Sequence, residues 1–198
     1  SGLPEIKSLK TSAVNIGQMM AQIGKRKRCQ CRDLRRRYLK SLKTPVQLTD
    51  IHSLGNTPLV FIWKKGLNQD VSDLGTDKVK QFAYPDPKAA IYGRAAQQYL
   101  DNLGLILHKD KVMKIAHVPQ VTAYVVKGEV DAGFVNRTAT RANKEKIGGS
   151  EELTKGYAPI HMIAAVVKGH EGDKNVQQFL AFLQSEQAKK ILMKHGIQ

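Results

Sequence analysis

Two stretches of the sequence could offer backbone amide groups to an anion. The first, residues 82–105 (FAYPDPKAAIYGRAAQQYLDNLGL), has the pattern of a strand end, a turn and a helix. Pro85 and Pro87 lack amide hydrogens and cannot continue a central strand, so the chain must turn there. The helix predicted over residues 89–103 has apolar residues four positions apart and stops at Gly104. The turn therefore brings the unpaired amides of a helix to the carboxyl end of a strand, which favours an anion.

The second stretch begins at Val118, after a short strand predicted over residues 112–115. Pro119 falls in the first turn of the predicted helix, where its missing amide costs no hydrogen bond. Val121 and Val125, one helical turn apart, give this helix a buried face. The sequence therefore predicts a second strand–turn–helix unit.

Other chemistry has little support. The six histidines are scattered, and the sequence contains no H-x-x-x-H pair, no G-x-S-x-G elbow and no Walker loop. Only His117, next to Val118, stands beside a proposed donor; it is more typical of a surface or hydrogen-bonded histidine. Cys29 and Cys31 are too close in sequence to bridge readily and have no partners for a zinc site. We therefore expect no enzyme, no metal site and no cofactor.

The positive charge is concentrated in one segment. The net charge is +15, and residues 25–43 hold ten basic side chains against one acid, Asp33. Such a run could neutralise phosphates, so an alternative function is binding of nucleic acid or another anionic surface. Its only aromatic residue is Tyr38, and it matches no helix-turn-helix pattern, so nucleic acid is the less favoured partner.

The elements that must position these groups alternate between strands and helices. No stretch approaches the roughly 18 to 20 apolar residues of a membrane span. Alternation of this kind indicates an α/β fold with mixed, mostly parallel sheets. Residues 136–150 are interpreted as a polar connection. The predicted strands cover residues 59–63, 79–83, 112–115, 131–135 and 160–167, and the later helices cover residues 175–183, capped by Asn175, and 186–194, capped by Ser185.

Four segments in order resemble the periplasmic molybdate-binding proteins of ABC importers. They are DPKAAIYGRAAQQYLDNLGL, HVPQVTAYVVKGEVDAGFV, APIHMIAAVVKG and VQQFLAFLQSEQAKKILMKHGI, and the similarity covers residues 58–198. The resemblance implies two α/β lobes with a ligand cleft between them. Lobe I would comprise residues 1–81 and 158–198, and lobe II residues 82–157.

The resemblance also implies a function and its partners. The chain would be the solute-binding component of an importer, holding molybdate or tungstate through backbone amides and neutral side chains. Its partner would be a membrane permease, and its location periplasmic or extracellular, after removal of a signal peptide that this sequence does not contain. A regulatory sensor with the same fold is a variant of the alternative function.

The ligand positions carry over residue by residue. The amides of Tyr92 and Val118 match two backbone donors of the family. A serine pair of the family falls on Asn15 and Ile16, with Ser12 as a nearby hydroxyl. The family's tyrosine after the second-lobe strand falls on Asn136. The oxyanion-binding residues implied are therefore Ser12, Asn15, Tyr92, Val118, Asn136 and, beside the last, Arg137.

Two departures from the family remain open. Arg137 could clamp an oxyanion bidentately or be a solvated surface charge. The family's opening strand and helix have no counterpart, and the basic run cannot be a buried strand, because buried unpaired charges are costly. We therefore expect an incomplete first lobe, which folds alone, leaves an open edge or borrows a strand from a second chain.

Overall fold

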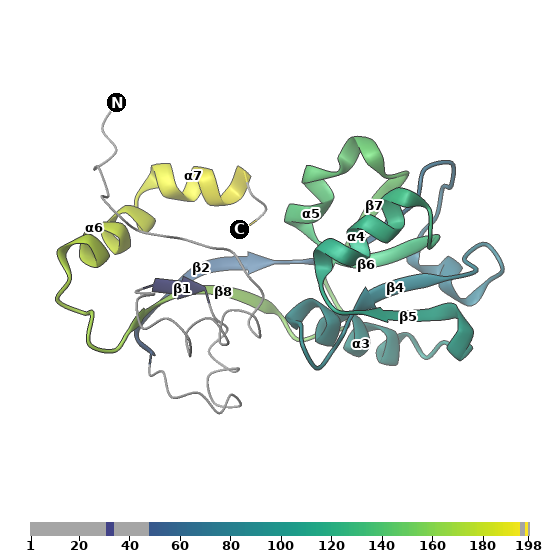
Figure 1. Cartoon of the computed structure of the whole chain (residues 1–198), viewed down its shortest axis with the longest axis horizontal. Coiled ribbons are helices and arrows are strands. Elements are labelled where there is room, and N and C mark those ends of the chain that lie inside the picture. Colours follow the sequence, from purple (N-terminus) through teal and green to yellow (C-terminus); the bar gives the residue numbers. More distant parts are fainter. Residues whose placement is uncertain (1–30, 34–47, 195–196, 198) are drawn as a thin grey trace. The chain divides into compact units, whose positions relative to one another are not determined.

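A computed structural model describes residues 31–33, 48–194 and 197 (Figure 1). The chain forms two compact units: residues 1–56 together with 161–198 make unit 1, and residues 57–160 make unit 2. No helix in the described ranges is long and apolar enough to cross a membrane.

Unit 2 is built on a five-stranded mixed sheet with the strand order β5-β4-β6-β3-β7. β4 runs parallel to β5 and β6, whereas β3 is antiparallel to both of its neighbours, β6 and β7. The strands are β3 (Leu59–Trp63), β4 (Phe82–Pro85), β5 (Val112–Ile115), β6 (Ala132–Asn136) and β7 (Gly149–Leu153). β3 is buried along its whole length, as expected for an inner strand covered on both faces.

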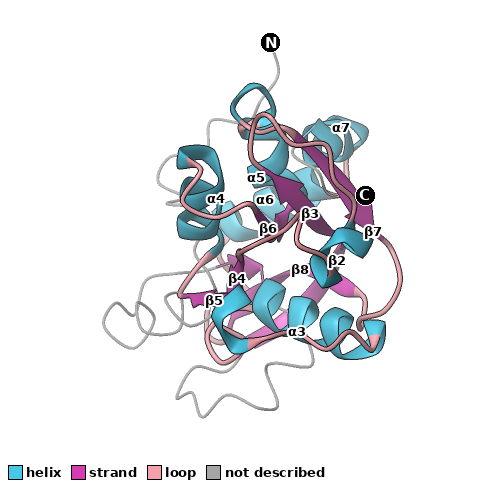
Figure 2. Ribbon diagram, turned by 90° about the vertical axis from the view of Figure 1, so that its right-hand side faces the viewer, coloured by secondary structure: helices cyan, strands magenta, loops and turns pink. Residues whose placement is uncertain are grey.

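Helices cover both faces of this sheet (Figures 1 and 2). α3 (Ile91–Leu103) packs on one face and α4 (Val118–Lys127) on the other, where the short α5 (Arg137–Ala142) also lies. Three 3-10 turns complete the unit: η1 (Val71–Gly75), η2 (Lys109–Lys111) and η3 (Lys144–Lys146).

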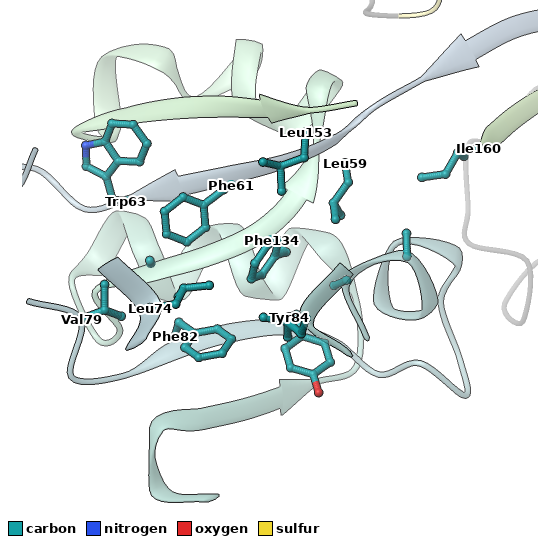
Figure 3. Packing of buried hydrophobic residues seen from close by; sticks show 14 residues of the cluster. Leu59, Phe61, Trp63, Leu74, Val79, Phe82, Tyr84, Phe134, Leu153 and Ile160 are labelled. Atoms are coloured by element: carbon teal, nitrogen blue, oxygen red, sulfur yellow. The ribbon is translucent and has the colours of Figure 1, made fainter. Parts of the chain in front are cut away.

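The two faces have different cores. On the α3 side, Phe61, Phe82 and Phe134 come from three strands and face one another, with ring centroids 5.3 Å apart for Phe61–Phe134 and 6.0 Å for Phe82–Phe134 (Figure 3). On the α4 side the core is aliphatic, including Val121 and Val125 as predicted from the helical spacing. Full burial of such large rings makes the α3 side the main hydrophobic contribution to the stability of the unit.

Unit 1, in its described part, is a three-stranded sheet with two helices. The strand order is β1-β8-β2, and Val166 packs with Val176 and Leu180 in a small buried cluster. The elements are β1 (Cys31–Asp33), β2 (Leu48–Thr57), β8 (Ile160–Val167), α6 (Lys174–Leu183) and α7 (Glu186–Lys194). β1, which falls in the basic run, is an edge strand antiparallel to β8.

Several elements differ from the sequence prediction. β3, expected in the first lobe, pairs with β6 and β7, so unit 2 begins at Thr57 rather than at residue 82. Residues 136–150 are not a plain connection, because they contain α5 and the start of β7. α6 is capped by Asp173, which accepts a bond from the Asn175 amide, and not by Asn175 itself.

The predicted strand over residues 79–83 was placed too early, since β4 begins only at Phe82. The amides of Lys80 and Gln81 bind the carboxylate of Asp131 at 2.7 and 3.2 Å instead of pairing in a sheet. The other long predictions are confirmed: β8 and α7 have the predicted bounds, and the Ser185 hydroxyl accepts a bond from Ala188 at the start of α7.

Candidate functional site

The candidate site lies where β4, β5 and β6 end, which we call the carboxyl edge of the unit 2 sheet. α3, α4 and α5 are the next elements of the chain after β4, β5 and β6, respectively. The chain passes from β4 through α3 to β5 on one side, and then through α4 to β6 on the other side of β4. The connection therefore reverses direction at β4, and ligands of open α/β sheets bind outside the carboxyl ends of strands at such a point.

The amino end of α3 has amides without acceptors. The carbonyl of Asp86 accepts from Ala89 and Ala90 at 3.0 and 2.9 Å, and the first helical bond runs from Arg94 to Ala90 at 3.1 Å. Ala90 has no side chain that could cap the helix. At this helix start, the amides of Ile91, Tyr92 and Gly93 have no acceptor among the described residues. The Tyr92 amide predicted from the sequence is thus one of three donors.

Gly93 lets α3 approach the preceding turn closely. A Cβ atom at this position would lie 2.2 Å from the carbonyl oxygen of Pro85 and 2.7 Å from that of Asp86. Both obstacles are backbone atoms, so a larger residue would push the start of the helix away from the carboxyl edge. This close packing fixes where the free amides point.

The amino end of α4 is partly capped. The His117 amide donates to Oε1 of Gln120 at 3.2 Å, and the His117 carbonyl accepts from Gln120 and Val121 at 3.1 and 3.2 Å. Pro119 has no amide hydrogen. The Val118 amide finds no acceptor among residues 48–194, as the sequence led us to expect.

Three of the predicted residues come together around one hydroxyl. The Tyr92 hydroxyl donates to Oγ1 of Thr57 at 3.3 Å, and the side chains of Asn136 and Arg137 lie near enough to influence its pKa. Burial raises the pKa of Tyr92 to about 12, although the bonds from Thr57 and Asn136 and the nearby guanidinium act in the opposite direction. This tyrosine therefore stays a neutral hydroxyl.

Arg137 is not the solvated surface charge that was one reading of the sequence. It is 9% exposed, and its guanidinium holds Glu152 of β7 in a bidentate pair, with Nε–Oε1 at 2.6 Å and Nη2–Oε2 at 2.8 Å. Hydrogen bonds from Arg137 hold the pKa of the Glu152 carboxyl below its ordinary value, and the same bonds raise the pKa of Arg137. Both groups are therefore charged at neutral pH.

Sequence reasoning missed Tyr157. Its hydroxyl accepts a bond from the Leu59 amide at 2.9 Å and donates to the Leu153 carbonyl, which joins the start of β3 to the end of β7. It also missed Glu152, and no local pattern marks either residue, because their partners lie far away in sequence. Asn136, which was predicted from the resemblance, caps α5, because its Oδ1 accepts a bond from the Ala139 amide at 2.8 Å.

The remaining predictions concern the other unit or other chemistry. Ser12 and Asn15 lie outside the described residues, as does nearly all of the basic run 25–43. Across the described residues, no group of three or more His, Cys, Asp or Glu side chains is placed to hold a metal ion.

Comparison with known proteins decides the family. The model of the bacterial extracellular solute-binding protein family matches residues 35–198, which include all of unit 2. The chain belongs to this family. The relatives in this family are solute-binding proteins rather than enzymes.

Two curated relatives support the assignment. YvgL of Bacillus subtilis, a lipoprotein named as a candidate ABC transporter substrate-binding protein, is 28% identical over 144 residues, 72% of this chain and 55% of its own. The molybdate-binding protein ModA of Azotobacter vinelandii is 28% identical over 120 residues, 59% of this chain and 48% of its own. This solute-binding protein spans about half the length of both.

Solved structures confirm the α/β fold class. The substrate-binding domain of a candidate molybdenum ABC transporter from Clostridium difficile matches with a TM-score of 0.72 and 27% identity, covering 96% of this chain and 85% of that one. The periplasmic molybdate-binding protein of Azotobacter vinelandii matches with a TM-score of 0.77 and 22% identity, over 94% and 85%. The mixed sheets of this solute-binding protein are those of the two-lobed periplasmic binding proteins.

Proposed function

We propose that this protein is the solute-binding component of an ABC importer and that its carboxyl edge binds a tetrahedral oxyanion, molybdate or tungstate. The observation that carries the proposal is the set of unpaired amides at the starts of α3 and α4, which flank the reversal point of the sheet. A helix amino end combines free donors with a favourable dipole, and two of them suit an anion with four oxygens. The names of the ModA relative and of the molybdenum transporter domain support this choice of anion.

The proposed donors are neutral. The amides of Tyr92 and Val118 would bind two oxygens, and Asn136 would contribute its side chain; Ser12 and Asn15 stay predicted donors from the residues that lie outside the described part. A periplasmic or extracellular location and a permease partner belong to the same proposal. No observation favours nucleic acid, because the basic run is almost entirely outside the described residues.

Thermal unfolding gives the first test. A ligand that binds only the folded state stabilises it by RT ln(1 + [L]/Kd), which is about 2.7 kcal/mol at 100 times Kd. Millimolar molybdate and tungstate should therefore raise the melting temperature, with sulfate as the comparison anion. If all three leave it unchanged, the proposal fails while the family assignment stands.

A single amide can then be removed. Val118→Pro deletes one proposed donor at the first position of α4, where proline is tolerated, and the preceding His117 already has the extended backbone that proline requires (φ −143°, ψ 157°). Val118→Ala keeps the amide and serves as the matched control. Loss of one hydrogen bond to an anion should weaken molybdate binding roughly 10- to 100-fold in titration calorimetry, by about 1.5–3 kcal/mol. Equal affinities of the two variants would exclude the Val118 amide as a ligand.

A further inference from the structure

The pair Arg137–Glu152 has a geometry that bears on the strength of the proposed site. Arg137 starts α5 at the end of β6, and Glu152 lies on β7, with β3 between the two strands. The guanidinium therefore reaches across the start of β3, which lies at the carboxyl edge because β3 is antiparallel to β6 and β7. Its side chain is 11% exposed, whereas that of Glu152 is 44% exposed.

The charge of Arg137 acts where the anion is proposed to bind. Arg137 directly follows Asn136, whose side chain is a proposed ligand, and its ion pair with Glu152 holds the guanidinium at the same carboxyl edge as the Tyr92 amide. Glu152 is the more exposed member of the pair. Its carboxylate binds Nε and Nη2 of Arg137, two of the donors with which an arginine binds a carboxylate or phosphate bidentately. While the pair is intact, its two charges cancel.

We propose that Glu152 sets the oxyanion affinity of this protein by masking the positive charge of Arg137. This inference rests on the proposed function. With Glu152 in place, an oxyanion meets amides and hydroxyls that recognise its oxygens by geometry alone. With Glu152 neutralised, the same anion also meets a full positive charge, which in the partly buried environment of a protein edge attracts it strongly.

The test compares Glu152→Gln with Glu151→Gln. Both variants remove one negative charge from β7, but neighbouring residues of a strand point to opposite faces. Glu151 accepts a bond from the Val71 amide at 3.1 Å, which a glutamine oxygen can still accept. The Glu151→Gln variant therefore controls for net charge and for expression, and thermal unfolding verifies that each variant is folded.

The probes are molybdate, a dianion, and perrhenate, a tetrahedral oxyanion with a single charge. Calorimetric titration should show roughly 10- to 100-fold tighter molybdate binding by Glu152→Gln than by the unchanged protein. Coulomb energy is proportional to the charge of the ligand, so the gain for perrhenate should be about half as large on a logarithmic scale. Added salt should shrink both gains.

The double variant Arg137→Gln/Glu152→Gln removes both charges and should return molybdate affinity to within about threefold of the unchanged protein, because close pairs are coupled. If Glu152→Gln binds molybdate no better than Glu151→Gln, or binds both anions more weakly, the masking role is overturned while the proposed function stands. If neither the unchanged protein nor any of the variants binds molybdate, the proposed function is wrong, and the inference that rests on it is wrong as well. Binding by Glu152→Gln alone would support masking in its strongest form.

Discussion

We call the edge of the unit 2 sheet where β4, β5 and β6 begin the amino edge. At this edge Asp131, which immediately precedes β6, binds groups just after the end of β3 and in the segment that precedes β4. Its carboxylate lies 2.6 Å from the Nζ of Lys64 and also binds the amides of Lys80 and Gln81. At the carboxyl edge, in contrast, the amides at the starts of α3 and α4 have no acceptor among the described residues. Both edges belong to the same strands, so the difference comes from the turns.

The contrast separates stability from binding. Satisfying a buried donor stabilises the fold, whereas leaving donors unpaired is costly and persists where a ligand can complete them. The amino edge has a second example in Lys111, whose Nζ donates to the carbonyls of Leu74 and Thr76 at 2.8 and 2.7 Å. Substitutions of the hydrogen-bonded groups at the amino edge should therefore change stability, whereas removal of an unpaired amide at the carboxyl edge should mainly change binding.

The largest effect on stability is expected for Asp131→Asn. The change removes an ion pair in which the carboxylate is 13% exposed and weakens two bonds to amides, so the free energy of unfolding should fall by about 3 kcal/mol. Urea denaturation measures this loss. Asp77→Asn, an exposed substitution near the same edge with the same change of charge, should fall within about 0.5 kcal/mol of the unchanged protein. A molybdate affinity altered by Asp131→Asn would break the separation between the edges.

The same residue predicts a pH dependence. Burial acts to raise the pKa of Asp131, but the hydrogen bonds from Lys64, Lys80 and Gln81 outweigh it and leave the pKa lowered from 3.8. A lowered folded-state pKa means that this stabilisation is present above the unfolded-state value and disappears as the pH falls through the folded-state value. The stability difference between Asp131→Asn and the unchanged protein should therefore shrink below a pH of about 4. A difference that stays constant down to pH 2 would show that the ionised carboxylate is not its source.

Tyr157→Phe tests a stabilising group at the carboxyl edge. The change removes the bonds between this hydroxyl and Leu59 and Leu153, and it leaves the Leu59 amide unsatisfied. The free energy of unfolding should fall by about 1–2 kcal/mol. Tyr124→Phe is the control, because Tyr124 belongs to α4, packs against the core on the other face of the sheet, and its hydroxyl makes no hydrogen bond within the described part of the chain. Equal stabilities of the two variants would mean that the carboxyl edge contributes no such bond.

The smallest effect is expected for Gln120→Ala. It removes the acceptor of the His117 amide at the start of α4, a capping contribution of about 0.5–1 kcal/mol. Thermal unfolding should detect a small decrease in the melting temperature. Gln98→Ala is unsuitable as a control, because the Gln98 side chain accepts a bond from the Ala158 amide. Gln178→Ala on the exposed side of α6 is a better comparison. A loss larger than 2 kcal/mol would show that this turn is part of the stabilising framework and not an adaptable one.

Local patterns predicted much of this edge. The helix starts at Ile91 and Val118 follow, to within two residues, from proline positions and apolar spacing, which depend on neighbouring residues only. β7 and α5 were missed because their stabilising contacts are distant: β7 pairs with β3, and α5 is positioned by Arg137 reaching Glu152. The polar composition of residues 136–150 gives no sign of either pairing. The position of β3 was missed for the same reason, since strand partners are set by the whole sheet.

The function of Arg137 shows a further limit. Its sequence position allowed a ligand or a surface charge, and the structure shows neither directly, since the guanidinium holds Glu152. The partner of this guanidinium, the Glu152 carboxylate, is 15 residues away in sequence and could be identified only from the three-dimensional structure. By comparison, the amide donors were predictable because every helix start has them, whatever its side chains.

The bridge made by Tyr157 has a consequence for the folding of the chain. Because its hydroxyl joins the first strand of unit 2 to the last, the two ends of residues 57–160 emerge from the same edge of one sheet. Residues 57–160 are a continuous segment inserted between the two parts of unit 1. Because the ends of this segment are adjacent, the insertion separates the two parts of unit 1 by only a short distance and costs little loop-closure entropy. The gene fragment for residues 57–160 should accordingly encode an autonomous folding unit, with its amides exchanging as one cooperative block.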